Sequence, residues 1–500
     1  VVVLAAAAPG AWAAEADPVR ACLGARDRTV ALAACDRALA ATLDVARRTD
    51  VRVARVHLLR DLDRHAEALA EAERLVKERP NTVEGLTARA DALTGLDRRD
   101  EAARDYAAAL KLKPDDATAR FGRGALRLLR GDYPGALGDF DAVVALAPNT
   151  PDLYVYRALA HSGALDNKAA LADLDLARRG GPLSPFGLRL RGDALHYLGR
   201  DREAVDAYSE ALRRAPADAD ALVARAESLG EIGKAEAGMK DIAAALKISP
   251  DDERAHAVQA SLQAGLGRYD DAVKTYRALL KRRPDDEDAG IGLGKALRSA
   301  GKPGDAVKVF DEVIRRQPAH ASAYYERGEA RRDLDDGKGA LADFDAAIKR
   351  APRMAVAHYE RAWTLSELDD HEAALAAFHR AVALDGQFVD AIAGQAWEMA
   401  ELGRTAEALS AYAAALKLDP KNTEALVGRG FAYGRQGDYA RSIADYRRAL
   451  EVNPRDANVW VQYGYVLEGA EDTAAARKAF DRALDLNPRR VDALVARGRV

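Results

Sequence analysis

Two short segments contain residue types that metal and phosphate chemistry uses. His371-Glu372 could begin a zinc-binding helix, which needs a second histidine four residues after the first, but Leu375 stands there. Residues 290–295, Gly-Ile-Gly-Leu-Gly-Lys, resemble a phosphate-binding loop, but Ala296 follows the lysine where Ser or Thr is required. Small residues at helix contacts account for these glycines better. We therefore predict no catalytic residue, no metal, no cofactor and no enzymatic activity.

The first fourteen residues resemble the end of a signal peptide. An apolar run at 1–8 is followed by Pro9-Gly10 and by the small residues of 11–14 before Glu15. We predict a partial signal peptide at residues 1–14 and an exported, periplasmic protein; the alternative is an apolar N-terminal cap. No later stretch reaches the ~20 apolar residues that span a bilayer, so we expect no membrane span.

Cys22 and Cys35 are the two cysteines of the chain. In an exported protein an isolated pair at this spacing is more typical of a disulfide than of a metal or redox site. Residues 31–39 are similar to the second helix of the repeat described below, and in that register the sulfurs face each other across a helical hairpin. We predict that a disulfide holds an N-terminal hairpin at 15–48. The alternative is two free, buried cysteines.

The elements of the chain follow a period of 34 residues, which proline marks. Gly386 takes the one missing place, and the prolines are Pro80, Pro114, Pro148, Pro182, Pro216, Pro250, Pro284, Pro318, Pro352, Pro420, Pro454 and Pro488. A fixed period of this length is the sequence signature of a solenoid. A solenoid offers an extended surface for binding, not a catalytic pocket.

Three positions of the repeat predict a close-packed pair of helices. With position 1 at residues 49, 83, 117 and onward to 457, position 8 is almost always Gly or Ala, and position 20 is mostly Ala. Position 24 is a large ring in ten repeats: Tyr106, Phe140, Tyr208, Tyr276, Phe310, Phe344, Phe378, Tyr412, Tyr446 and Phe480. Small residues let two antiparallel helices approach, and proline at position 32 ends the second helix.

Segments such as 324–330 (Tyr-Tyr-Glu-Arg-Gly-Glu-Ala), 340–352 and 441–454 resemble the tetratricopeptide repeat family. The resemblance covers residues 49–490 in thirteen copies. It implies an all-α, right-handed solenoid of helix–turn–helix units with a concave inner face. Residues 491–500 begin the first helix of a further, truncated repeat. Repeats 151–184 and 219–252 depart from the pattern, because Leu174 and Ile242 replace the ring.

Arginine at position 7 and an acidic residue at position 23 occur together. Where position 7 is not arginine, position 23 is never acidic. We predict ion pairs between the two helices of a repeat, with a structural role. The pairs are Arg55 with Glu71, Arg89 with Asp105, Arg123 with Asp139, Arg157 with Asp173, Arg225 with Asp241, Arg327 with Asp343, and Arg429 with Asp445.

The inner face is where we expect binding. The resemblance implies that positions 2, 5, 9 and 12 of the first helix line the concave wall. Aromatic side chains at positions 5 and 9 gather toward the C-terminus and form a predicted aromatic strip: Tyr325, Tyr359, Trp363, Trp397, Phe431 and Tyr465. Such rings can anchor a peptide. The alternatives are that they fill the core or that they stack on a glycan. Acidic residues at position 2 are expected to serve the helix dipole.

Composition excludes one class of partner. Net charge is −4 and no dense Lys/Arg block occurs, so the sequence predicts no nucleic-acid binding. We expect a scaffold that binds peptide segments or partner proteins. The alternative is an interaction module of a larger exported enzyme or secretion machine, with a further domain after residue 500.

Overall fold

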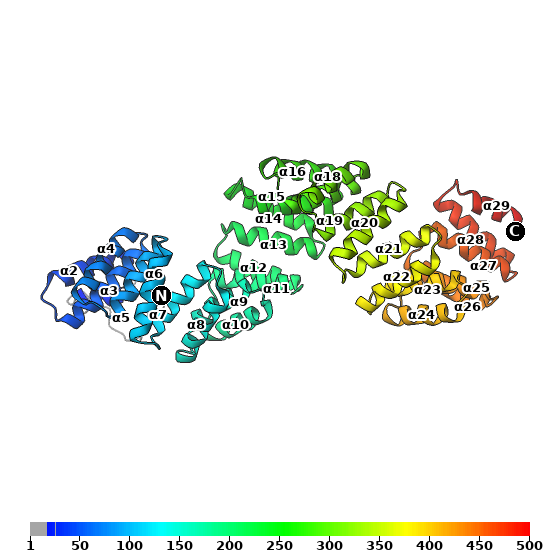
Figure 1. Cartoon of the computed structure of the whole chain (residues 1–500). Coiled ribbons are helices and arrows are strands. Elements are labelled where there is room, and N and C mark those ends of the chain that lie inside the picture. The colour runs from blue at the N-terminus through cyan, green and yellow to red at the C-terminus, as the bar shows by residue number, and fades with distance from the viewer. Residues whose placement is uncertain (1–17, 26) are drawn as a thin grey trace. The chain divides into compact units, whose positions relative to one another are not determined.

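The computed structural model describes residues 18–25 and 27–500, and in these residues it contains 29 α-helices and no strand. The predicted leader at 1–14 lies outside the described residues. The chain divides into two compact units, one up to Val258 and the other from Gln259, and the division falls within α15 (Glu253–Gly265). Within each unit, the helices follow one another as antiparallel pairs (Figure 1).

The helices that precede α15 belong to the first unit. They are α1 (Pro18–Gly24), α2 (Arg28–Ala40), α3 (Val45–Asp61), α4 (His65–Glu78), α5 (Val83–Gly95), α6 (Arg99–Leu112), α7 (Ala117–Leu129), α8 (Tyr133–Leu146), α9 (Pro151–Gly163), α10 (Asn167–Gly180), α11 (Pro185–Tyr197), α12 (Asp201–Arg214), α13 (Ala219–Glu231) and α14 (Ala235–Ile248).

The helices that follow α15 belong to the second unit. They are α16 (Tyr269–Arg282), α17 (Glu287–Ser299), α18 (Pro303–Arg316), α19 (Ala321–Arg332), α20 (Gly337–Arg350), α21 (Ala355–Glu367), α22 (His371–Leu384), α23 (Val389–Glu401), α24 (Thr405–Leu418), α25 (Thr423–Arg435), α26 (Tyr439–Val452), α27 (Ala457–Gly469), α28 (Thr473–Leu486) and α29 (Val491–Arg499).

Helix boundaries recur at the same repeat positions because the same residue types recur there. The first helix of a repeat runs from position 1 to about 13 and the second from 17 to 30, as α5 and α6 do. A side chain at position 34, such as Asp116 or Asn422, accepts the amide hydrogen bond that begins the first helix. Position 15 has a positive φ in all thirteen repeats, and glycine occupies seven of these places. The chain is therefore an all-α solenoid of helix–turn–helix repeats.

The core of each repeat lies where the ring at position 24 meets the small residue at position 8. Phe140 and Phe344 are fully buried, and each lies against a glycine of its own repeat, Gly124 or Gly328. A Cβ on either glycine would lie less than 3 Å from the ring. The small residue at position 8 is thus required by the large one at position 24.

The N-terminal hairpin consists of α1 and α2, and a disulfide joins Cys22 to Cys35. Both cysteines are buried against Val51 of α3. Helix α3 begins at Val45, four residues before the repeat boundary that the 34-residue period places at 49. The cap and the first repeat therefore share a core.

Successive first helices contact each other in both units, whereas successive second helices do not. Among the described residues, α3 contacts α5, α5 contacts α7, α23 contacts α25 and α25 contacts α27. No comparable contact joins α4 to α6 or α24 to α26. In each unit the first helices are therefore the inner layer, as the repeat pattern predicts.

Candidate functional site

The predicted aromatic strip lies on the first helices of the second unit. Its side chains come from α19, α21, α23, α25 and α27, one or two from each. Five of the six are half-buried, and Tyr465 is 41% exposed. None is fully buried, so each ring retains a surface that a ligand can contact.

Most rings of the strip rest on the buried ring of their own repeat. The centroid of Tyr325 lies 5.9 Å from that of Phe344, Trp363 lies 5.3 Å from Phe378, and Tyr465 lies 5.4 Å from Phe480. The strip thus fills part of the core with one side and faces outward with the other. Core filling and ligand contact are not exclusive at these positions.

One ring stack joins the strip from one repeat to the next, and further ring contacts lie within repeat 355–388. The rings of Trp397 and Phe431 stack with centroids 5.8 Å apart and planes inclined by 24°. Tyr359 lies edge-on to Trp363 at 6.3 Å and also 4.9 Å from Phe388. The sequence pattern did not indicate Phe388, because it stands at position 34, outside the first helix. The available signal was the position of Phe388 directly before α23, two residues from Asp390 at position 2 of that helix.

Charged side chains form a ladder at the N-terminal end of the strip. Arg298 of α17 donates to Glu329 of α19 at 2.9 Å, and Arg332 of α19 donates to Glu360 of α21 at 2.5 Å. Burial first, and the charge of Glu329 next, raise the pKa of Glu360 to about 7. Ion pairs therefore connect α17 to α19 and α19 to α21. Ring stacking connects α23 to α25.

The structure places all seven arginine–carboxylate pairs together. In six of them the arginine donates through Nε and Nη2 to both carboxylate oxygens, at 2.5–2.9 Å: Arg89–Asp105, Arg123–Asp139, Arg157–Asp173, Arg225–Asp241, Arg327–Asp343 and Arg429–Asp445. Arg55 and Arg52 share Glu71 in the first repeat. Every carboxylate is buried and bound, so none is free to act as a catalytic acid or base.

Several of these arginines also bond to the preceding repeat, which the sequence comparison within one repeat missed. Arg327 Nη1 donates to Asp311 at 2.5 Å, and Arg157 Nη1 donates to Asp141 at 2.8 Å. Both aspartates stand at position 25 of the preceding repeat, in its second helix. One guanidinium therefore joins three helices. The signal was an acidic residue sixteen places before the arginine.

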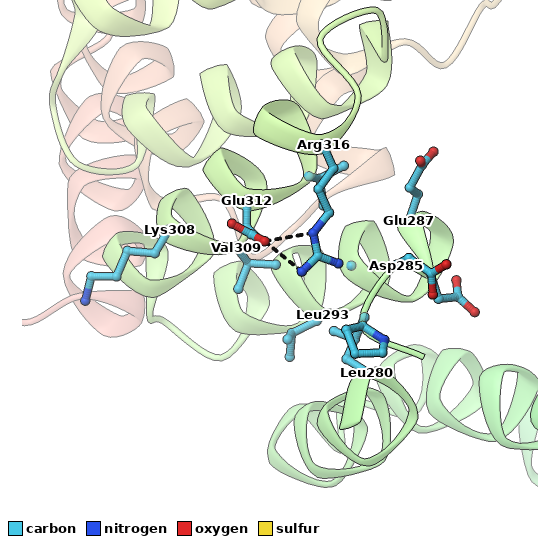
Figure 2. A pocket seen from close by; sticks show the side chains of 12 residues that line it. Leu280, Asp285, Glu287, Leu293, Lys308, Val309, Glu312 and Arg316 are labelled. Carbon is cyan, nitrogen blue, oxygen red and sulfur yellow. Dashed lines mark hydrogen bonds and ion pairs between the residues drawn. The ribbon is translucent and has the colours of Figure 1, made fainter. Parts of the chain in front are cut away.

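Three surface pockets lie in repeats that lack the ion pair. Leu293 and Val309 replace it in repeat 287–320, and both line a pocket of about 310 Å³ between α16, α17 and α18. Figure 2 shows Arg316 beside this pocket, bonded to Glu312 of its own helix at 2.7 Å. Similar pockets lie at Arg361 with Ala377 and at Tyr463 with Ala479. In each of these three repeats the side chain at position 23 is apolar.

The first unit contains a larger cavity that the sequence did not indicate. Its volume is about 600 Å³, and Phe121, Leu129, Leu153 and Tyr156 line it together with a polar end at Asp91. Phe121 meets Tyr156 edge-on at 4.8 Å. Because position 9 of this repeat is only Ala125, the space over α7 remains open.

The polar end of this cavity is internally paired. Asp91 accepts from the Tyr106 hydroxyl and lies 3.2 Å from Nε2 of His57 and 3.5 Å from Nη1 of Arg60. Burial opposes ionisation, but the hydrogen bond and charge of His57, aided by Arg60, hold the pKa of Asp91 below its ordinary value. The carboxylate is therefore neutralised without a ligand.

The described part of the chain contains neither a metal-binding cluster nor a membrane-spanning helix. No group of three or more His, Cys, Asp or Glu residues is arranged to hold a metal ion there. Within residues 18–25 and 27–500, every helix is too short or too polar to cross a bilayer.

Known proteins similar to this chain contain the same repeat. A sequence profile described as Tetratricopeptide repeat matches residues 87–151, 189–253, 223–287, 257–303, 291–355, 325–387, 430–490 and 464–500, and one described as TPR repeat matches 398–437. Protein FlbA of Caulobacter vibrioides is 36% identical over 134 residues, which are 26% of this chain. The match spans only 22% of the length of FlbA.

Three solved structures are similar to this chain. A chain of the APC/C hetero-tetramer Cut9–Hcn1 is 14% identical to this chain. The match covers 90% of this chain and 96% of that chain, with a TM-score of 0.45. Yeast Tom70 is 16% identical, with 83% and 96% covered and a TM-score of 0.43. A tetratricopeptide repeat protein of Parabacteroides merdae is 19% identical, with 50% and 98% covered and a TM-score of 0.44. Because the repeat profile matches more than half of its residues, the chain belongs to the tetratricopeptide repeat family.

Proposed function

We propose that this protein is a non-enzymatic scaffold that binds a peptide segment of a partner protein along the first helices of its second unit. The repeat array is a scaffold of the kind that serves protein–protein interaction. The observation that carries the proposal is the stack of Trp397 on Phe431, because it joins two repeats in a half-buried aromatic surface. Partly exposed aromatic rings supply large contact areas at interfaces.

Peptide binding fits this surface better than the two alternatives from the sequence. Full core filling would bury the rings completely, as it buries Phe378, but the strip is only half-buried. Sugar stacking uses an open ring face, whereas Trp397 and Phe431 occupy one face of each other. We place the protein in the periplasm on the strength of the apolar and small residues of 1–14.

A capture experiment tests the proposal. The wild-type chain and the Trp363→Ala/Trp397→Ala variant are immobilised and exposed to a periplasmic extract of the source organism. We expect proteins that the wild type captures and the folded variant does not. Trp460→Ala is the matched control, since Trp460 lies outside the strip and bonds to the Pro454 carbonyl. Equal capture by the folded double variant would contradict the proposal.

A further inference from the structure

Two carboxylates and two rings of the aromatic strip form parallel rows across α23 and α25. Asp390 stands seven residues before Trp397, and Glu424 stands seven residues before Phe431. Seven residues are two helical turns, so each acid and its ring share a face about 10 Å apart. The two acids interact electrostatically and the two rings stack. One face therefore carries negative charge at one end and an aromatic surface at the other.

Glu424 is a carboxylate without a cation. It is half-buried, and no hydrogen bond or ion pair reaches it within residues 18–25 and 27–500. Burial first, and then the charge of Asp390, raise its pKa to about 7. This differs from the expectation that position 2 serves the helix dipole, which would lower the pKa. Asp390 accepts only a neutral donor, Nδ2 of Asn422 at 2.8 Å.

The hydroxyl of Tyr412 is a second group without a partner. It is buried and makes no hydrogen bond. The equivalent hydroxyls of Tyr106 and Tyr208 bond to an aspartate at position 9, and that of Tyr446 bonds to Gln462.

The sequence around Tyr412 explains the loss of its partner. Position 9 of this repeat is Trp397, and Gly428 lies against the hydroxyl where a Cβ would overlap it. Burial and the nearby charge of Glu424 raise the pKa of Tyr412, which keeps its O–H neutral. An unsatisfied carboxylate and an unsatisfied hydroxyl therefore lie beside one aromatic surface.

We propose that this face receives a lysine or arginine side chain of the partner peptide, with its charge at Glu424 and Asp390 and its neighbouring apolar part on Trp397 and Phe431. The inference rests on the proposed function and names the chemistry of the partner. Several N–H donors on one cation can bind the two carboxylates that the chain leaves without a cation. The Arg435 guanidinium carbon lies 5.9 Å from the Phe431 centroid, which is a cation–π distance, so this ring already has a cation beside it in the chain.

A metal ion fits the same face poorly. Calcium takes about six to eight oxygen ligands, whereas only Glu424 and Asp390 are offered here. Aromatic rings add nothing to the coordination of a hard cation but add to the binding of a guanidinium or ammonium group. The pairing of acids with stacked rings therefore selects an organic cation.

The test is a selection of peptides. A phage library of random dodecamers is selected at pH 8 on the wild type, on Glu424→Gln and on Tyr412→Phe, and individual peptides are then synthesised. We expect lysine or arginine to be enriched in peptides selected by the wild type, and this enrichment to be lost on Glu424→Gln. A selected peptide should bind Glu424→Gln about tenfold more weakly, the loss of one charge-assisted interaction.

Control variants separate the outcomes. Glu84→Gln changes the same repeat position where the glutamate is exposed, and it should leave the enrichment unchanged. Glu424→Gln removes an unpaired charge, so it should fold at least as stably as the wild type at pH 8. Tyr412→Phe should keep the preference for peptides with lysine or arginine but bind them more weakly. Peptides that depend on Trp397 but show no excess of lysine or arginine would overturn this inference and leave the proposed function standing. If no selected peptide depends on Trp397, both are overturned.

Discussion

Trp397 of one repeat stacks on Phe431 of the next, with ring centroids 5.8 Å apart and planes at 24°. The pair lies on the inner helices α23 and α25, which also pack directly on each other. Neither ring is fully buried, whereas Phe378 in the core below is 0% exposed. This difference separates rings that hold a repeat together from rings that remain partly accessible at its surface.

Alanine substitution distinguishes the two kinds of ring. Phe378→Ala should destabilise its repeat by about 3–5 kcal/mol, because it leaves a cavity in the core. Trp397→Ala should cost only about 1–2 kcal/mol, because part of its side chain is already in water. Hydrogen exchange of the amides in α21–α25 measures both, and equal losses would show that Trp397 is a core residue.

The arginine pairs can be tested against an exchange that the chain already contains. Arg327→Ala should destabilise α19 and α20 by roughly 2–4 kcal/mol, because it leaves Asp343, which is 2% exposed, with Arg331 as its remaining cation. The double change Arg327→Leu/Asp343→Val copies Leu293 and Val309 and should recover most of the loss. A double variant as unstable as Arg327→Ala would contradict the account. Amide exchange in α19 and α20 is again the measurement.

The turn at position 15 offers a stabilising substitution. Leu165 has φ 62° and its side chain is 83% exposed, whereas glycine occupies this place in Gly131 and Gly199. A left-handed backbone costs a residue with Cβ about 1–2 kcal/mol. Leu165→Gly should therefore stabilise the α9–α10 hairpin by roughly 1 kcal/mol, and Gly199→Ala should destabilise α11–α12 by a similar amount. A lower thermal midpoint for Leu165→Gly would refute this reading.

Stability should depend on pH through the buried acids of the strip. The pKa of Glu424 and that of Glu360 are raised from 4.5 to about 7 in the folded chain. Between these values the folded state holds protons that the unfolded state has released, so their contribution to the free energy of unfolding falls as pH rises from about 4.5 to 7. The groups whose charge is coupled to Glu424 are Asp390, Tyr412 and Tyr359.

Glu424→Gln isolates one of these groups. The difference in thermal midpoint between wild type and variant should shift in favour of the variant from pH 4.5 to 7. The affinity of the wild type for a peptide with lysine or arginine should rise over the same pH range, because Glu424 loses its proton and becomes negatively charged. A pH-independent difference between wild type and variant would show that Glu424 titrates normally.

Much of the fold could be predicted because the same residue types recur at the same positions of each repeat. The ring at position 24, the small residue at position 8 and the proline at position 32 describe contacts within one hairpin, and these contacts are local in sequence. Arg327 and Asp343 were found for the same reason. The bond from Arg327 to Asp311 crosses from one repeat to another, so a comparison made within the repeat could not show it.

The proposed binding face was only partly predictable. The first-helix aromatics could be assigned from their positions, but their half-burial depends on how neighbouring helices pack. Phe388 acquires its role from a contact with Tyr359 near the start of its own repeat. Glu424 acquires its role from the charge of Asp390 in the preceding repeat. The cavity over Ala125 arises because a small side chain leaves space, and its size depends on the placement of Phe121 and Tyr156. None of these is a property of one position.

The most direct test of the central claim observes the tryptophans of the strip themselves. The chain has four tryptophans, and 5-fluorotryptophan labelling gives each a separate fluorine NMR signal, which single Trp→Phe variants assign. When a peptide selected on the wild type is added, the signals of Trp363 and Trp397 should shift and saturate together, while that of Trp460 stays in place. A bound peptide that leaves Trp363 and Trp397 unshifted would contradict the claim that the aromatic strip is the binding surface.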